Sequence, residues 1–351
     1  MDYLKRRFIS NGVVVSIILT LFYYFLMEYT SYYFFKLPAF PIAIILGFIN
    51  FISVALEFKH SNPITRFLMQ FSEIVKWGFL MFAFLAVAIW IIDSFIYPIP
   101  LLYRRLSLLL IVILFIYGYY NAHKLTITEH TLYIKDLPEE IDLIHLSDIH
   151  VGSVRRGNLL KKLVDKINEQ DVDLVIISGD LADGTSEIHE NDFADFKNCK
   201  VPVIFTPGNH DYYLDVEKII KAAKKADMIV LDNDQTEFKG LNIYGISYDM
   251  FGENSIILNI DKDNTNLIIY HVPQQWDKFQ ELGFDIQLSG HTHGGQFHPG
   301  TFFVKLVFPY LRGLYEKNGN YMNVSDGIGT MGPPIRWGTK SEVGILKLRK
   351  K

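Results

Sequence analysis

Apolar residues follow one pattern in the first third of the chain and a different pattern afterwards. Up to about residue 120 they form long runs with few charges, whereas charged residues are concentrated after Lys124. A helix needs roughly 20 mostly apolar residues to cross the hydrocarbon core of a bilayer. Four runs reach or approach that length, at residues 9–27, 37–56, 77–97 and 106–120. This pattern predicts a transmembrane helical bundle of about four helices over residues 1–122.

The orientation of this bundle depends on the fourth run, which is the shortest and would also suit a helix lying in the membrane interface. Lys and Arg are enriched in cytoplasmic loops. With four spans, most flanking basic residues share the side of the N-terminus: Lys5, Arg6, Arg7, Lys59, Arg66, Lys76 and Lys124, against Lys36, Arg104 and Arg105 opposite. We therefore predict a multi-pass inner-membrane protein whose C-terminal domain faces the cytoplasm. Without the fourth span, that domain would lie on the other side.

Two features of the apolar third have a second interpretation. Lys5-Arg6-Arg7 resembles the start of a twin-arginine export signal, which would place the C-terminal domain outside the cytoplasm. The apolar run behind it is too long for such a signal, and further runs follow without an evident cleavage site. Glu28 and Asn50 lie within the apolar third, and we expect them to serve helix packing or interface placement in preference to a substrate path.

After Lys124 the apolar runs become short and alternate with amphipathic segments. Leu125 and Ile127, then Leu132 and Ile134, alternate with polar residues and predict a two-stranded start to a second domain. Buried strands are predicted at 141–146, 174–177, 201–206, 267–270 and 284–288, with helices at 158–170, 216–226 and 274–281. Alternating strands and helices are typical of an α/β fold. Residues 123–351 are therefore predicted to form one α/β domain.

Composition narrows the functional classes. Half of the residues are apolar, 15% are aromatic and the net charge is −4, so no basic surface indicates a nucleic-acid partner. Cys199 is the single cysteine, which excludes an internal disulfide and suits a reducing compartment. The ordinary interpretation of Cys199 is a small buried residue.

Short polar clusters follow the five predicted strands of the α/β domain. They read Asp148-Ile149-His150, Gly179-Asp180, Gly208-Asn209-His210-Asp211, His271, and Gly290-His291-Thr292-His293. Any one of these histidines, taken alone, is more often a hydrogen-bonded loop residue than a ligand. Five clusters in succession, each after a strand, do not fit that explanation. The remaining histidines belong to no cluster and are interpreted as ordinary residues: His60, His123, His130, His145, His189 and His298.

The clustered side chains have the chemistry of a metal centre. Carboxylate, amide and imidazole groups bind hard or borderline divalent cations, and no thiolate occurs among them. Asp148 and His150 are two residues apart, so both can reach one cation, and Gly179 leaves Asp180 room to bridge two cations. We predict two divalent cations, manganese by preference, with magnesium, iron and zinc also compatible. The predicted ligands are Asp148, His150, Asp180, Asn209, His271, His291 and His293.

The order of these motifs resembles the calcineurin-like metallophosphoesterase superfamily. The motifs that carry the resemblance are Asp148-Ile149-His150, Gly179–Asp183, Gly208–Asp211, His271-Val272-Pro273 and Gly290–Gln296, and the closing segment Val324–Arg336 is similar to the membrane-associated branch. The resemblance covers about residues 140–345 and implies a β-sandwich flanked by helices, with the site at the strand ends. It implies that one cation binds Asp148, His150, Asp180 and His293, and the other Asp180, Asn209, His271 and His291.

The resemblance also implies an enzyme that hydrolyses a phosphoric ester or pyrophosphate. Two cations would clamp the phosphate oxygens and activate a water molecule. His210 would lie beside the phosphoryl group, where it protonates the leaving oxygen or stabilises negative charge. Asp211 is a candidate to orient His210, or equally to cap the following helix. Asp183 and Thr292 are candidates to support the metal ligands.

The substrate is less defined by the sequence than the reaction. The resembled branch includes hydrolases of UDP-2,3-diacylglucosamine in lipid A synthesis, and a membrane domain suits a lipid-linked substrate. The apolar segment Thr301–Leu311 is a candidate dock for acyl chains, with an ordinary buried segment as the equal alternative. Arg155, Arg156 and Arg336 are candidates to bind diphosphate oxygens, although a solvated loop suits the first two slightly better.

Three alternative functions stay open at this point. The same ligands would serve a phosphodiesterase of soluble nucleotides or a protein phosphatase, in which the membrane helices would provide localisation alone. A membrane transporter or sensor with a metal-binding domain would need no complete ligand set. The intact Asp180 and His210 argue against this non-enzymatic alternative.

Overall fold

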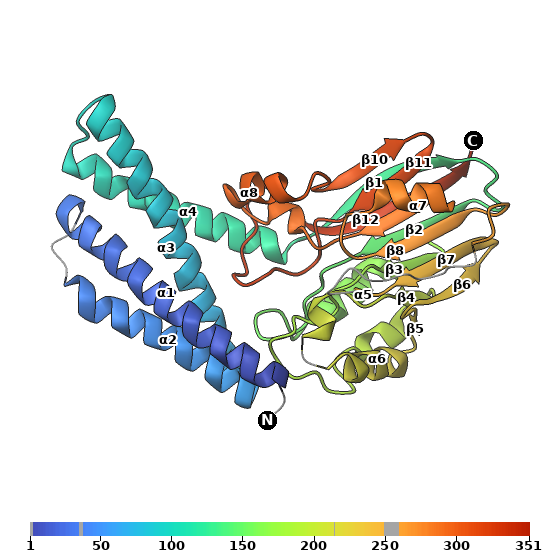
Figure 1. Cartoon of the computed structure of the whole chain (residues 1–351), viewed down its shortest axis with the longest axis horizontal. Coiled ribbons are helices and arrows are strands. Elements are labelled where there is room, and N and C mark those ends of the chain that lie inside the picture. The colour runs from blue at the N-terminus through green and yellow to red at the C-terminus, as the bar shows by residue number, and fades with distance from the viewer. Residues whose placement is uncertain (1–2, 35–37, 214, 249–259) are drawn as a thin grey trace. The chain divides into compact units, whose positions relative to one another are not determined.

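The computed structural model describes residues 3–34, 38–213, 215–248 and 260–351, with the backbone alone for 3–11 and 31–33. The chain separates into two compact units. The first contains residues 1–120 with Gly332–Pro334, and the second contains Asn121–Met331 with Ile335–Lys351. Figure 1 labels the helices and strands of both units.

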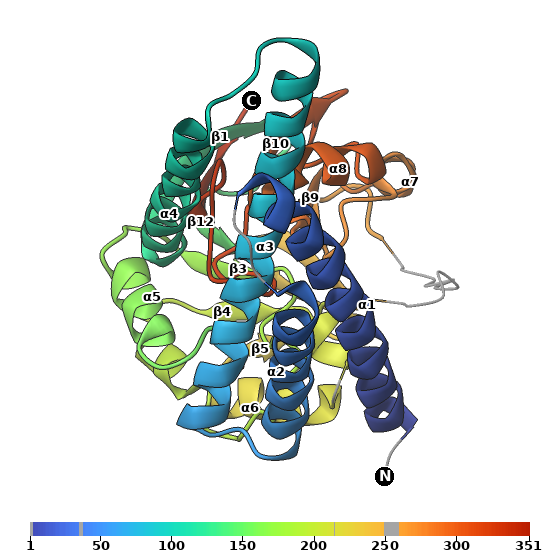
Figure 2. The same cartoon turned by 90° about the vertical axis from the view of Figure 1, so that its left-hand side faces the viewer.

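The first unit consists of long apolar helices. They are α1 (Tyr3–Tyr33), α2 (Ala39–Lys59), α3 (Pro63–Phe95) and α4 (Leu101–His123), of which α4 continues into the second unit with its last turn. Each contains a stretch long and apolar enough to cross a membrane. The prediction of four membrane helices is therefore confirmed by length and composition. Helices α1 and α2 pack against each other (Figure 2).

Helix α3 begins at a strong local signal. The side chain of Asn62 accepts hydrogen bonds from the backbone N–H groups of Ile64 and Thr65, and Thr65 Oγ1 accepts one from the N–H of Asn62. Pro63 occupies the first helical position, where its missing N–H costs nothing. This reciprocal capping ends the link from α2 and determines where α3 starts.

Polar side chains join the membrane helices to one another. Asn50 Nδ2 in α2 donates to Ser16 Oγ in α1 at 2.8 Å, and Ser72 Oγ in α3 donates to Asn50 Oδ1 at 3.0 Å. Asn50 is 2% exposed, so both groups of its amide are partnered inside the unit. Because a buried amide needs such partners, Asn50 has the helix-packing role expected from the sequence.

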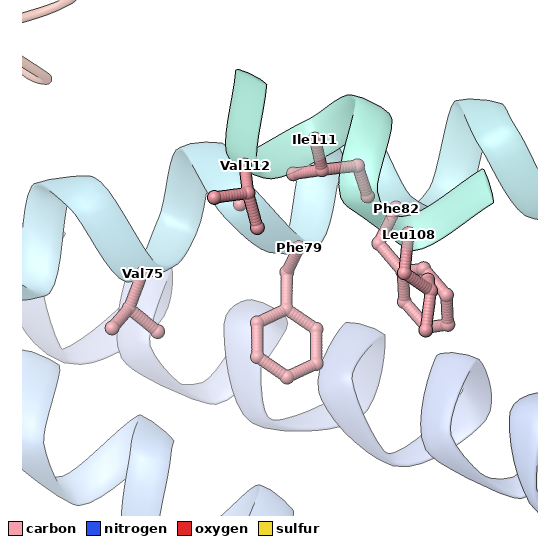
Figure 3. A pocket seen from close by; sticks show the side chains of 7 residues that line it. Val75, Phe79, Phe82, Leu108, Ile111 and Val112 are labelled. Carbon is pink, nitrogen blue, oxygen red and sulfur yellow. The ribbon is translucent and has the colours of Figure 1, made fainter. Parts of the chain in front are cut away.

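An apolar hollow of about 360 Å³ lies between α3 and α4 (Figure 3). The residues that line it are Val75, Gly78, Phe79, Phe82, Leu108, Ile111 and Val112. No polar side chain is among them, so the hollow suits a hydrocarbon chain and not a phosphate group.

The second unit is built on two six-stranded sheets. The first has the order β1 (Leu125–Ile134), β12 (Ser341–Lys350), β2 (Ile141–Leu146), β3 (Leu174–Ile177), β4 (Val203–Phe205), β5 (Ile229–Val230). The second has the order β10 (Gly313–Lys317), β11 (Asn320–Val324), β9 (Ile286–Ser289), β8 (Asn266–Tyr270), β7 (Leu241–Ile246), β6 (Asp234–Phe238). The helices are α5 (Leu159–Asn168), α6 (Val216–Lys225), α7 (Trp276–Leu282) and α8 (Gly300–Val307), with short 3-10 helices at Ala194–Asn198, His210–Tyr212 and His293–Gly295.

Alternation along the strands divides the apolar residues between layers. In β3, Leu174 and Ile176 join the core between the two sheets, whereas Val175 and Ile177 join the core on the outer face of the first sheet. Helices α5 and α6 complete that outer core, and α7 contributes Phe279 to a core on the second sheet. The unit therefore consists of two packed sheets with helices outside them. The predicted membrane helices followed by a two-sheet α/β domain are confirmed.

The start of the second unit differs from the sequence prediction. Residues 125–134 form one strand, β1, which pairs in parallel with β12 along its whole length, so the predicted two-stranded start is wrong. Leu125 and Ile127 pack against the outer core, whereas Leu132 and Ile134 belong to the core between the sheets. The apolar positions change from odd to even because one strand contacts a different core at each end.

Ile176 provides a test of the core between the sheets. Replacing the fully buried Ile176 with Ala leaves a cavity in packed surroundings and should cost about 2–5 kcal/mol of unfolding free energy. The matched variant Ile229→Ala shortens a side chain that is 43% exposed and should cost far less. Thermal unfolding of the purified protein in detergent, followed by tryptophan fluorescence, measures both changes. Equal losses from the two variants would contradict this packing.

Candidate metal centre

The predicted site residues follow five strands whose carboxyl ends meet at one edge of the second unit. Asp148 and His150 follow β2, Asp180 follows β3, and His271 comes directly after β8. Asn209 and His210 follow β4, and His291 and His293 follow β9. Strands β2, β3 and β4 are parallel to one another, as are β8 and β9. Parallel pairing therefore brings clusters that are distant in the sequence to the same edge.

The ligand atoms of the predicted residues lie a few ångströms apart. His150 Nε2 is 3.1 Å from His293 Nε2, which is 3.3 Å from Asp148 Oδ1. His271 Nε2 is 3.1 Å from Asp180 Oδ2. Three groups keep all their ligand atoms within 4.8 Å: Asp148 with His150 and His293, His150 with Asp180 and His210, and Asp180 with His271 and His291. Asn209 Oδ1 lies 2.9 Å from His291 Nδ1.

These spacings fit divalent cations. Two donor atoms that are each about 2.1 Å from one cation, at right angles, are about 3 Å apart. The ring nitrogen His271 Nε2 is buried and has no hydrogen-bond partner, although the Asp180 carboxylate is close to it. A cation would supply the missing partner. Asp180 belongs to two of the three groups, which is the placement that a bridging carboxylate needs.

Burial concentrates negative charge in the cluster. Asp148 and Asp180 are 0% and 1% exposed. Burial acts to raise the pKa of each carboxyl, but the surrounding imidazoles, chiefly His293 for Asp148 and His271 for Asp180, hold both pKa values well below the usual range. Conversely, burial acts to lower the pKa of His271, and Asp180 outweighs it and raises that pKa to about 10. The site therefore demands positive charge, which a divalent cation supplies in place of a proton.

Two other imidazoles are in the neutral form that a metal ligand requires. Burial lowers the pKa of His291 to about 4, with a further contribution from charge on His271. Burial likewise holds the pKa of His293 well below its ordinary value. Both rings are therefore ready to bind a cation without first losing a proton.

Five cluster residues have a backbone conformation that residues other than glycine rarely adopt. The φ angle is 51° at Asp148, His150 and His293, 55° at Asp180 and 70° at His291. Each such angle costs on the order of 1–3 kcal/mol and persists only where the surroundings hold it. Hydrogen bonds of 3.0 Å from Asp148 N to the carbonyl of Gly179, and from His150 N to that of Asp180, provide this support. Strain of this kind gathers at functional sites.

His210 is oriented by a backbone carbonyl. Its Nδ1 lies 2.8 Å from the carbonyl oxygen of Asp183, so Nδ1 carries a proton and donates it. This bond leaves Nε2 available, and His210 belongs to one group with His150 and Asp180. The ring also packs against Tyr213, with centroids 4.6 Å apart. Tyr213 accepts a hydrogen bond of 2.7 Å from Asn209, and no motif in the sequence identifies this contact.

Asp211, the candidate to orient His210 or to cap the following helix, is fully buried. Its carboxylate accepts hydrogen bonds from the backbone N–H groups of Gly208, at 2.8 Å, and Ala182, at 2.9 Å. It therefore ties the loop after β4 to the loop after β3, and Asp183 takes the orienting role through its carbonyl. Capping of α6 falls to Asp215, whose side chain accepts from Lys218 N. Burial raises the pKa of Asp211 to about 7.

The three candidate arginines occupy different surroundings. Arg336 is fully buried and donates to the carbonyls of Gly329 and Gly327, and its Nη2 lies 3.4 Å from His293 Nδ1. These hydrogen bonds support the closing segment beside His293, and a contact of Arg336 with substrate stays a prediction. Arg156 donates to Asp192 at 3.0 Å and to the carbonyl of Glu187. Arg155 is 4% exposed.

A buried network behind His271 was not identified from the sequence. Asn323 Nδ2 donates to His145 Nδ1 at 2.7 Å, and His145 Nε2 lies 2.8 Å from Ser178 Oγ. The carbonyl of Ser178 accepts from His271 Nδ1 at 2.7 Å. This last bond leaves Nε2 of His271 for a cation. His145 lies inside β2, where its sequence context is that of an ordinary strand residue.

The structure also places two other residues near these motifs in the sequence. Thr292 donates to the carbonyl of Leu311 at 2.6 Å, and His298 is exposed.

Comparisons with known proteins agree with this geometry. The profile of the calcineurin-like phosphoesterase family matches residues 141–295. A metallophosphoesterase of Helicobacter pylori (strain J99) is 33% identical over 235 residues, which are 63% of each protein. A metallophosphoesterase of Campylobacter jejuni is 31% identical over 265 residues, 70% of each protein. A transmembrane protein with a metallophosphoesterase domain from Danio rerio is 28% identical over 274 residues, 70% of this chain and 62% of that protein. The chain thus covers less than two thirds of the Helicobacter protein's length.

Gly208 provides a test of the cluster in which no ligand residue is itself replaced. A Cβ at this position would lie 2.3 Å from Asp180 Oδ1 and 2.6 Å from Asp180 N. Gly208→Ala should therefore displace Asp180 and weaken manganese binding about 10–100-fold, the loss typical of disturbed ligand support. In the control Gly78→Ala, the added methyl group meets nothing within 4 Å. Titration calorimetry of the purified protein measures both affinities. Unchanged affinity in Gly208→Ala would refute this placement of Asp180.

Proposed function

Because this chain belongs to the calcineurin-like phosphoesterase family, we propose that it is a membrane-anchored hydrolase of phosphoric esters that works with two divalent cations. The observation that carries the proposal is the buried cluster in which Asp180 is shared between groups of ligand atoms. Asp148, His150, Asp180 and His293 would hold one cation, and Asp180, Asn209, His271 and His291 the other. A pair of divalent cations supplies charge neutralisation and an activated water nucleophile.

His210 is proposed as the general acid. Burial lowers the pKa of its imidazole, so the protonated ring is a stronger acid than ordinary histidine. Nδ1 keeps its proton on the carbonyl of Asp183, and Nε2 therefore carries the transferable one. An anionic phosphoryl group beside Nε2 stabilises the doubly protonated ring. As the bond from phosphorus to the leaving oxygen breaks, Nε2 gives that oxygen its proton.

Leaving groups of different basicity test this role. His210→Ala should lower kcat for a diester with an alkoxide leaving group by about 10²–10⁴-fold, the usual contribution of a general acid. The loss should be much smaller for a p-nitrophenyl diester, because p-nitrophenolate departs without protonation. Metal content should stay at the parent value, whereas Asp180→Ala should lose metal and turnover together. Equal losses on both diesters would exclude proton donation by His210.

We further propose that the substrate is a lipid-linked phosphoric ester or pyrophosphate reached from the cytoplasmic side. The support for this is a chain with four helices that are long and apolar enough to span a membrane. Placement of the hydrolase domain in the cytoplasm rests on the distribution of basic residues around those helices. UDP-2,3-diacylglucosamine is the first substrate to assay, and manganese the first cation.

Assays with three substrates test the lipid-linked substrate separately from the hydrolase activity. The purified protein in detergent with manganese is assayed against UDP-2,3-diacylglucosamine, bis(p-nitrophenyl) phosphate and p-nitrophenyl phosphate. We expect kcat/KM for the lipid pyrophosphate to exceed the other values by orders of magnitude. Activity on the small diester alone would exclude the lipid-linked substrate but would support the proposed hydrolase activity. A metal-loaded protein inactive on all three would overturn the hydrolase itself.

A further inference from the structure

Helix α8 presents an apolar stripe that no described part of the chain covers. Phe302, Phe303, Leu306 and Val307 are between 54% and 71% exposed, and none of the eight residues of α8 is buried. The four side chains occupy two neighbouring i, i+4 rows, so they form one continuous surface along the helix. Contiguous exposed apolar surface on a folded domain marks an interaction site. Figure 1 labels α8 in the second unit.

Three contacts fasten α8 to the loop that carries His291 and His293. The ring of Phe308, the residue after the helix, lies 5.3 Å from the ring of His291. Thr292 Oγ1 donates to the carbonyl of Leu311. At the other end, a Cβ on Gly295 would lie 2.3 Å from Thr301 Cα, so the first turn of α8 touches the same loop. The apolar stripe is therefore held beside the metal-site cluster.

The last turn of α4 reaches the same loop from another direction. Asn121 belongs to the second unit, and its Nδ2 donates to the carbonyl of Thr339 at 3.0 Å. Thr339 Oγ1 in turn donates to the carbonyl of Gln296 at 2.7 Å, where the loop that begins at Gly290 ends. Ala122 is fully buried. Two side-chain hydrogen bonds thus connect the end of a membrane-spanning helix to the loop on which α8 is mounted.

We propose that α8 is an interfacial helix whose apolar stripe inserts into the bilayer surface. The bilayer is the occupant because the chain leaves its last membrane helix at residue 123, and Asn121 at the end of that helix is connected by hydrogen bonds to the loop that α8 contacts. The exposed Lys305 suits anionic head groups beside an inserted apolar stripe. Insertion would seat the opening of the metal site at the membrane surface.

This inference names a substrate class and in that respect rests on the proposed function. With α8 in the interface, an amphiphile keeps its apolar part in the bilayer along Phe302 and Leu306 while its phosphoryl group reaches the cluster. His291 connects the cluster to α8, because it is a predicted metal ligand and its ring also contacts that of Phe308. The class is therefore a phosphoester or pyrophosphate carried by a membrane-resident amphiphile.

Depth-dependent quenching tests the insertion without any substrate. Cys199 is the single cysteine, so Cys199→Ala gives a background for Phe303→Cys, Leu306→Cys and the control Tyr133→Cys. Tyr133 is 54% exposed, and along β1 it lies roughly 26 Å from Leu125 by strand rise. The full chain, labelled with the fluorophore NBD, is reconstituted in vesicles of phosphatidylcholine and phosphatidylglycerol. Doxyl-labelled lipid then serves as the membrane quencher and iodide as the aqueous one.

We expect labels at 303 and 306 to be quenched by doxyl lipid severalfold more than the label at 133, and protected from iodide. Quenching by iodide equal to that at 133 would overturn the proposal, because α8 would then face water. Protection from both quenchers would overturn it too, since protein and not lipid would cover the helix.

A matched pair of esters tests the consequence for catalysis. Hexadecyl p-nitrophenyl phosphate in vesicles and methyl p-nitrophenyl phosphate in solution share one leaving group and differ in their apolar chain. The variant Phe302→Ser with Leu306→Ser should lower the ratio of hexadecyl to methyl hydrolysis at least about tenfold, whereas Tyr133→Ser should keep the parent ratio. An unchanged ratio would overturn the assigned substrate class. A metal-loaded parent that hydrolyses neither of these esters nor UDP-2,3-diacylglucosamine would overturn the proposed hydrolase function, and the quenching result would still decide where α8 lies.

Discussion

The rest of the site depends on stabilising two buried carboxylates, those of Asp148 and Asp180. A buried charge is tolerated only with an opposite charge or hydrogen-bond donors beside it. His271 Nε2 lies 3.1 Å from Asp180 Oδ2, and the backbone N–H of His291 donates to Asp148 Oδ2 at 3.0 Å. Carboxylate and imidazole groups also bind divalent cations. The fold therefore places negative charge where a cation stabilises it, and five strands must end together for this to occur.

Holding the cluster requires a second layer that is itself buried. Asp211 joins two of the ligand loops through backbone N–H groups, and Arg336 gathers the carbonyls of the closing segment behind His293. The carbonyl of Ser178, whose hydroxyl group contacts His145, accepts a hydrogen bond from His271 Nδ1 and leaves Nε2 available. All four of these side chains are buried. Backbone hydrogen bonds from Asp148 N and His150 N support the left-handed backbone angles of those two cluster residues.

A single residue separates the last apolar helix from the first strand of the phosphoesterase unit. Helix α4 ends at His123 and β1 begins at Leu125, so there is no long flexible linker between a span and the sheet. Asn121 and Thr339 continue that connection to the loop of the metal site. An enzyme joined to the bilayer in this way meets substrates that are themselves in the bilayer at high local concentration. Helix α8 contacts the same metal-site loop, so the proposed insertion of its apolar stripe would bring that loop to the bilayer surface.

Local patterns in the sequence determined the membrane helices, the buried strands and the residues that come together. Apolar runs and period-two alternation depend on neighbours along the chain, so β2 and β3 agree with their predicted bounds, and polar residues after parallel strands converge by geometry. Only the tertiary structure decided which buried residues support the metal-site cluster. The sequence offers Arg336 as a candidate for diphosphate binding and Asp211 as one for orienting His210 or capping a helix, yet both are fully buried against other loops. The single strand β1 likewise contacts two cores that its own sequence cannot distinguish. Burial by segments far apart in the chain leaves no local pattern, and for that reason only the folded structure reveals it.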